Sequence, residues 1–171
     1  MAIGPQDPAS TRPAPPPDPA ETDLAGASIL VVDDNEQNLE LLLAYLEELP
    51  CRVSTARDGI EALDAVHASR PNLVLLDVMM PRMSGFQVCA RLKQNPATRD
   101  IPVVMVTALN EVGDVERAVD SGADDFLTKP VSRVDLLTRA RSLVRLSLLQ
   151  RQLNKTLAEL RAIDGAPGPR A

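Results

Sequence analysis

Residues 29–35, ILVVDDN, form an unbroken apolar run that ends on two acidic side chains and an asparagine. Four consecutive apolar residues are typical of a parallel strand that is covered on both faces. Asn35 is a residue type that caps helices, and the leucines that follow it share one helical face. This stretch therefore predicts a buried strand whose carboxyl end carries acidic groups and leads directly into a helix.

The same alternation of strand and helix recurs along the chain. Further strands are predicted at 52–56, 73–76, 103–106 and 125–128, with amphipathic helices between them, the weakest over 112–119. Right-handed crossovers put a helix between successive parallel strands and so cover both faces of the sheet. We expect an α/β fold, a doubly wound five-stranded parallel sheet with helices on both faces.

The two ends of the chain differ in composition from this repeating part. Residues 1–26 are rich in proline and predict a disordered leader, which leaves 27–148 as the folded unit. A last helix is predicted from Ser132, the start of a capping box, and it runs into an extension and tail over 149–171. Residues at alternating spacings of three and four, all of them leucine except one glutamine, form a leucine seam that is typical of a coiled coil. The leucine seam consists of Leu143, Leu146, Gln150, Leu153, Leu157 and Leu160. Glycine and proline after 164 end the helix.

Composition excludes several classes of function. A net charge of −6 argues against general binding to nucleic acid, which needs clustered Lys and Arg. The chain lacks an apolar run of about 20 residues and a secretory signal, so we expect a cytoplasmic protein without a membrane segment. Cys51 and Cys89 lie far apart, which indicates neither a disulfide framework nor a zinc site.

Polar residues lie where four of the predicted strands end. They are Asp33, Asp34, Asp77, Thr107 and Lys129. The carboxyl ends of parallel strands meet at one edge of a sheet, where ligands bind. Three carboxylates at that edge need a cation or a proton, and Mg²⁺ prefers oxygen ligands of this kind. A carboxylate can also attack phosphorus, with lysine and threonine as donors to the phosphoryl oxygens. Each residue alone has a plain structural explanation, but their convergence predicts a phosphoryl-transfer site.

Four segments resemble the signature segments of the receiver domain of two-component response regulators, the CheY-like family. These are ILVVDDN at 29–35, LVLLDVMMPRMSG at 73–85, IPVVMVTA at 101–108 and GADDFLTKP at 122–130. The resemblance covers about residues 28–148, and it is closest to stand-alone receivers and to the leading receivers of diguanylate cyclase regulators. It implies a flavodoxin-like sheet in the strand order 2-1-3-4-5. It also implies that Asp77 accepts a phosphoryl group from a histidine kinase or a phosphotransfer protein.

The resemblance assigns further roles to individual residues. It implies that Asp34, Asp77 and the backbone carbonyl of Met79 ligate Mg²⁺, while Asp33 acts largely through water. Thr107 and Lys129 match the family's switch pair, and Phe126 matches its rotating aromatic. The Lys129-Pro130 bond is expected to be cis. Activation would draw Thr107 toward the phosphoryl group and let Phe126 turn inward, which remodels a surface for a downstream protein.

Several alternatives stay open at this point. With no output domain after Ala171, the first hypothesis is a stand-alone receiver, and the second is the regulatory module of a larger enzyme such as a diguanylate cyclase. A phosphatase of the haloacid dehalogenase type is disfavoured, because Asp77 is followed by Val78 and Met79 rather than by the DxD pattern. A receiver that no longer takes phosphate is disfavoured, because every residue that the resemblance assigns to phosphorylation is present. Apolar Met79 and Leu109 predict a long-lived phosphate, and the last helix predicts a homodimer or a connection to a partner.

Overall fold

The computed structural model of the chain describes residues 24–108, 116–117 and 119–164. The predicted leader up to residue 23, most of the helix predicted over 112–119, and the tail after 164 lie outside the described residues. All five predicted strands are confirmed to within one residue at either end. The elements are β1 (Ser28–Val32), α2 (Glu36–Leu46), β2 (Arg52–Ala56), α3 (Gly59–Ser69), β3 (Leu73–Asp77), α4 (Gly85–Gln94), β4 (Val103–Thr107), β5 (Asp125–Thr128) and α6 (Arg133–Asp164).

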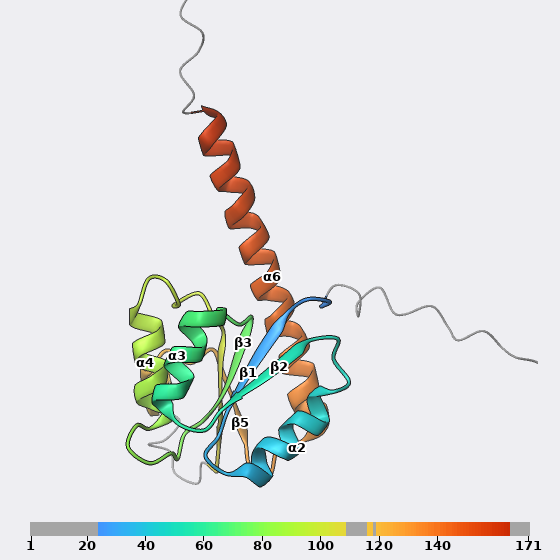
Figure 1. Cartoon of the computed structure of the whole chain (residues 1–171), viewed down its shortest axis with the longest axis vertical. Coiled ribbons are helices and arrows are strands. Elements are labelled where there is room, and N and C mark those ends of the chain that lie inside the picture. The colour runs from blue at the N-terminus through green and yellow to red at the C-terminus, as the bar shows by residue number, and fades with distance from the viewer. Residues whose placement is uncertain (1–23, 109–115, 118, 165–171) are drawn as a thin grey trace, which may run out of the picture.

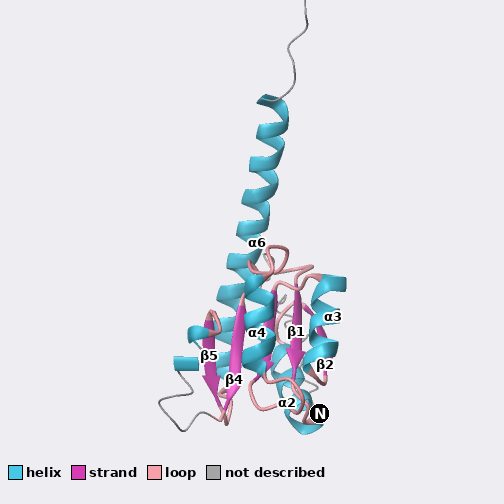
Figure 2. Cartoon of the chain, turned by 90° about the vertical axis from the view of Figure 1, so that its left-hand side faces the viewer, coloured by secondary structure: helices cyan, strands magenta, loops and turns pink. Residues whose placement is uncertain are grey.

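The strands form one five-stranded sheet in the order β2-β1-β3-β4-β5, and every pairing is parallel. This is the order that the family resemblance implies. Helices α3 and α4 cover one face of the sheet, and α2 and α6 cover the other (Figure 1). All strands point the same way, so their carboxyl ends share one edge (Figure 2).

Two apolar layers hold the helices against the sheet. Side chains alternate between the faces of a strand, so Ile29 and Val31 of β1 face α2 and α6, whereas Leu30 and Val32 face α3 and α4. The central strands β3 and β4 are buried along their whole length. Burial on both faces explains why these strands appear in the sequence as continuous apolar runs.

Polar side chains at the helix starts fix where the strands end and the helices begin. The Asn35 side chain accepts hydrogen bonds from two backbone amides of α2, as predicted, and Asp58 does the same for α3. Helix α4 begins with a capping box of Ser84 and Gln87, which the sequence analysis did not single out. At α6 the Ser132 hydroxyl accepts a hydrogen bond from the Asp135 amide at 3.4 Å. These caps satisfy backbone amides in the first turns of the helices.

The two ends of the described chain join the body of the domain in different ways. Leu24, placed in the leader by composition, is buried in the core beside α2 and α6. Helix α6 runs without a break for 32 residues, about 48 Å at 1.5 Å per residue, and leaves the body at the amino edge of the sheet (Figures 1 and 2). No helix in the described part of the chain is long and apolar enough to cross a membrane.

Candidate functional site

The sheet brings the predicted site residues together at its carboxyl edge. Val32 pairs with Leu76 in the register of β1 and β3, so the next residues, Asp33 and Asp77, come level with each other. Thr107 ends β4 next to β3, and Lys129 directly follows β5. The site is therefore a product of strand register, as the sequence analysis expected.

Three carboxylates form an acidic cluster at this edge. One oxygen each from Asp33, Asp34 and Asp77 lie within 4.8 Å of one another. Asp33 and Asp77 are buried, at 1% and 4% exposure, whereas Asp34 is exposed. Two buried carboxylates beside an exposed one form an oxygen-only donor set that opens to water on one side. This donor set fits Mg²⁺, which takes one or two carboxylates and keeps several waters.

Asp33 is fixed by the first turn of α2. Its Oδ1 accepts a hydrogen bond from the Asn35 amide at 2.9 Å, and its Oδ2 accepts one from the Asn38 side chain at 3.1 Å. No sequence pattern points to Asn38, because an asparagine inside a helix gives no signal of its own. Its amide holds the Asp33 carboxylate in one orientation within the cluster.

Lys129 bridges the two buried carboxylates. Its Nζ donates to Asp77 Oδ1 at 2.8 Å and to Asp33 Oδ2 at 3.0 Å. Burial by itself would lower the pKa of the Lys129 ammonium, but these hydrogen bonds outweigh it and raise that pKa. Lys129 therefore stays charged and faces Asp77 from the side of β5.

Burial raises the pKa of Asp77, and repulsion from Asp33 adds to this effect. The hydrogen bond from Lys129 opposes it without cancelling it. A carboxylate whose charge is disfavoured in this way gains from a cation placed beside it. The electrostatics of the cluster therefore favour the binding of a metal ion.

The two expected switch residues lie on neighbouring strands in different environments. Thr107 is buried at the end of β4, and its carbonyl accepts a hydrogen bond from the Lys129 amide at 2.8 Å. Phe126, in β5, is 39% exposed and so stands outward in this conformation. The Lys129-Pro130 bond is cis, as expected.

Met79 and Leu109 were expected to give the phosphoryl group a long life. Met79 is 77% exposed in the loop that follows Asp77, so its apolar side chain stands at the surface beside the acidic cluster. Leu109 lies outside the described residues.

Gly85 supports the site through its lack of a side chain. A Cβ at this position would lie 2.2 Å from the carbonyl oxygen of Asp77 and 2.9 Å from the Cα of Val78. The Gly85 amide also donates to the carbonyl of Val78 at 3.0 Å. The start of α4 thus packs directly on the backbone that carries Asp77, an approach that only glycine allows.

The chain matches the family described as "Response regulator receiver domain" over residues 29–141. Its relatives include the response regulator PleD of Caulobacter vibrioides, at 48% identity over 145 residues, which is 85% of this chain and 32% of PleD. The transcriptional regulator RpaA of Synechocystis is 42% identical over 117 residues, or 68% of this chain and 48% of RpaA. The chain thus spans about a third to a half of these relatives.

Solved structures agree with the curated relatives. A putative response regulator from Chloroflexus aurantiacus matches 70% of this chain and 98% of its own, with a TM-score of 0.67 and 29% identity. The signal receiver domain of a histidine kinase from Syntrophus aciditrophicus is 39% identical, with a TM-score of 0.66 over 70% of this chain and 90% of its own. The strand order, the acidic cluster and these matches lead to one conclusion: the chain belongs to the response regulator receiver domain family.

Proposed function

We propose that Asp77 is the phosphoacceptor and takes its phosphoryl group from a histidine kinase or a phosphotransfer protein. A carboxylate oxygen of Asp77 attacks phosphorus, and an O–P bond forms as the bond from phosphorus to the donor's leaving atom breaks. The observation that carries this proposal is the placement of Asp77, buried in the acidic cluster and hydrogen-bonded to Lys129. Lys129 faces the negative charge that the transfer adds, and the Thr107 hydroxyl is the neutral donor.

Mg²⁺ is the cofactor that suits this donor set. Asp34, Asp77 and the backbone carbonyl of Met79 would hold it, with Asp33 acting largely through water. When bound, Mg²⁺ neutralises charge that develops on the transferred phosphoryl oxygens. The close approach of the three carboxylates supports the assignment, because a cation among them offsets their mutual repulsion.

The direct test is incubation of the protein with acetyl phosphate and Mg²⁺, followed by intact mass measurement. We expect a single phosphate adduct that is lost in acid or hydroxylamine, as an acyl phosphate would be. A kinase-bound donor serves as a second trial, because donors differ in reactivity. If neither donor leaves an adduct, the chain is a degenerate receiver.

Phosphorylation is proposed to act on a protein-binding surface. Phe126 stands partly exposed beside the start of α6, in a small cavity with Pro130 and Arg139. Movement of Thr107 toward the phosphoryl group frees the space into which Phe126 turns, and the surface of β5 and α6 changes shape. The downstream partner is a protein that distinguishes these two shapes. A receiver that takes phosphate from a sensor kinase in this way works in the cytoplasm.

Met79 is proposed to lengthen the life of the phosphoryl group. Its exposed apolar side chain stands where water approaches the acyl phosphate, whereas a polar side chain there would hold a water molecule. Replacing Met79 with Asn is expected to speed self-dephosphorylation about tenfold, equivalent to about 1.4 kcal/mol in the barrier. Decay of the adduct by intact mass measures this rate, with Met79→Leu as the apolar control. Equal lifetimes for the Asn variant and wild type would contradict the role of Met79.

The leucine seam of α6 is proposed to pair with a second copy of the chain. Leu146, Leu153 and Leu160 are each about half exposed, so the residues that the structure describes leave much of the leucine seam open to solvent. Light scattering is expected to give about twice the monomer mass of 18.4 kDa, at least with a phosphoryl mimic bound. The double variant Leu153→Asp, Leu157→Asp is the monomeric control. A monomeric wild type with and without the mimic would reject this dimer.

A second candidate function is a regulatory receiver within a larger output enzyme such as a diguanylate cyclase. The continuous α6 favours it, because a rigid helix can carry a change of orientation to a following domain. The chain's span of 32% of PleD is compatible with this arrangement. Both candidates share the chemistry at Asp77 and differ in what α6 contacts.

A further inference from the structure

Helix α6 carries a buried stripe of side chains that changes from apolar to polar along the helix. Leu137, Ala140 and Val144 pack into the core, and the same stripe continues with Ser147, which is buried, and Arg151, which is partly buried. The spacing of three and four residues keeps all five on one face of the helix. Every side chain described after Arg151 is exposed. The last contacts between α6 and the body are therefore polar.

Arg151 contacts the carboxyl end of α3. Its Nη2 donates to the carbonyl of Arg70 at 2.8 Å and to the carbonyl of Pro71 at 2.6 Å. Arg70 is the C-cap of α3 and has a left-handed backbone, with φ of 44°. A guanidinium at this point satisfies terminal carbonyls and meets the negative end of the helix dipole.

Arg151 makes these contacts at an electrostatic cost. Burial lowers the pKa of its guanidinium, and the charge of Arg70 lowers it further. Arg70 is itself paired with Asp100 at 3.4 Å, which partly offsets the repulsion. A residue that only solvated the helix surface would turn to water, so the contacts of Arg151 indicate a specific attachment.

Ser147 makes a second attachment one turn earlier. Its hydroxyl oxygen accepts a hydrogen bond from the side chain of Asn72 at 3.4 Å, and both residues are buried. The Asn72 side chain also accepts from the Ser28 amide at 3.0 Å, and the Asn72 amide donates to the Ser28 carbonyl at 2.7 Å. Asn72 immediately precedes β3, so α6 is tied to the amino end of the strand that carries Asp77.

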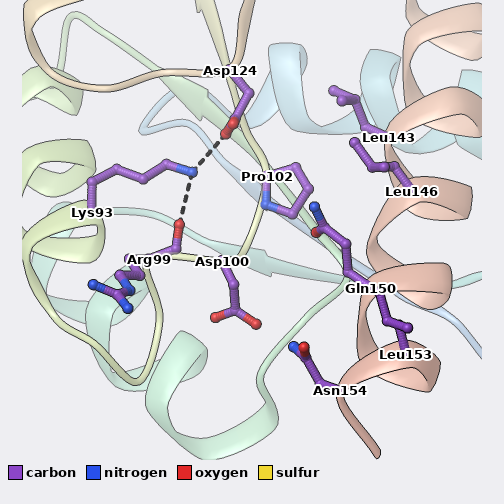
Figure 3. A pocket seen from close by; sticks show the side chains of 10 residues that line it. All are labelled: Lys93, Arg99, Asp100, Pro102, Asp124, Leu143, Leu146, Gln150, Leu153 and Asn154. Carbon is purple, nitrogen blue, oxygen red and sulfur yellow. Dashed lines mark hydrogen bonds and ion pairs between the residues drawn. The ribbon is translucent and has the colours of Figure 1, made fainter. Parts of the chain in front are cut away.

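These contacts set the direction in which the leucine seam faces. Figure 3 shows Leu146, Gln150 and Leu153 of α6 across a groove of about 330 Å³ from the turn that carries Arg99 and Asp100. The opposite side of this turn is anchored by Lys93, whose Nζ contacts Asp124 and the carbonyl of Arg99 (Figure 3). Rotation of α6 about its axis would open or close this groove and would break the contacts of Arg151.

We propose that Arg151 and Ser147 form a clamp that fixes the exit direction and the rotation of α6 relative to β3. Without the clamp, α6 would stay attached through its apolar residues up to Leu148, and its last turns would swing. The clamp is a positioning device for whatever the helix contacts, and it is independent of phosphoryl transfer at Asp77. It goes beyond the proposed function because it assigns a role to residues at the opposite edge of the sheet.

Pulsed electron paramagnetic resonance tests the clamp in the full chain. Spin labels are placed at Ala68→Cys in α3 and Ala162→Cys near the end of α6, both exposed, with Cys51 and Cys89 replaced by Ser and Ala. Labelled protein is diluted with unlabelled protein, so that only distances within one chain are measured. We expect a narrow distance distribution in the parent and at least a twofold wider one with Arg151→Gln.

Arg161→Gln is the matched control, since Arg161 is exposed on the same helix beyond the body. Its distribution should equal that of the parent. The clamp is refuted if Arg151→Gln leaves the distribution unchanged, or if Arg161→Gln widens it as much. Circular dichroism and the acetyl phosphate adduct check that each variant is folded, so a failure at Asp77 is distinguished from a failure of the clamp.

Hydrogen exchange of the parent protein gives a readout that needs no variant. Amides of α6 are expected to stay protected through Arg151 and to exchange about tenfold faster from Lys155 onward, because local opening is easier where contacts end. Protection that falls away already at Ser142 would overturn the clamp.

Ser147→Ala, which removes only one hydroxyl, should widen the spin-label distribution less than Arg151→Gln does.

Discussion

Asp77→Asn is expected to abolish the acid-labile phosphate adduct, a loss of at least about 100-fold in the rate of labelling. An amide has the shape of the carboxylate, so the fold is kept and the amide oxygen can still accept the hydrogen bond from Lys129. The amide lacks the nucleophilic oxygen that attacks phosphorus. Intact mass after incubation with acetyl phosphate and Mg²⁺ measures the effect.

Two further variants make the result specific. Asp34→Asn should leave Asp77 reactive but raise the Mg²⁺ concentration needed for half-maximal labelling, by about tenfold if Asp34 is a ligand. Asp64→Asn, an exposed carboxylate on α3, should behave as wild type. An adduct of undiminished yield on Asp77→Asn would show that another residue accepts the phosphoryl group.

Gly85→Ala is expected to lower the free energy of unfolding by about 3 kcal/mol, the upper end of the range for overpacking. The new Cβ would lie 2.2 Å from the carbonyl oxygen of Asp77, and both sides of this contact are backbone. Strand β3 and helix α4 would have to separate, which also displaces the Asp77 carboxylate. Urea unfolding measures the stability, and the acetyl phosphate adduct measures the loss of reactivity.

Gly26→Ala is the contrasting change. Gly26 has a φ of +88°, but a Cβ there would meet no atom within 4 Å. Its cost is therefore limited to backbone strain, about 1 kcal/mol, without an effect on labelling. If the two variants lose equal stability, then the close approach at Gly85 is not what makes glycine necessary there.

The sequence predicts the strands and the site well because both follow from local patterns. Continuous apolar runs such as 29–32 are typical of strands that are covered on both faces, and the polar residues that end these runs are brought together by parallel register. The proximity of Asp33, Asp77 and Lys129 could therefore be predicted without knowledge of tertiary contacts. The short distances between these side chains agree with the convergence that the pattern predicted.

Other features depend on contacts between distant segments and leave no local pattern. Asn38 orients Asp33 from within a helix, and Leu24 joins the core although its surroundings are rich in proline. In α6 the leucine seam accounts for most of the apolar periodicity. The sequence pattern therefore does not indicate the second buried face, which ends in Ser147 and Arg151. The partners of that face, Arg70 to Asn72, are about 80 residues earlier in the chain.

The departure of α6 from the amino edge of the sheet has a consequence for simultaneous binding. A phosphoryl donor must approach the carboxyl edge, where the acidic cluster opens to water. Helix α6 extends from the opposite edge, so the body of the domain separates its far end from the acidic cluster (Figure 2). A protein bound to the end of the helix therefore does not compete with the donor for space. The receiver can gain and lose a phosphoryl group while that protein stays bound.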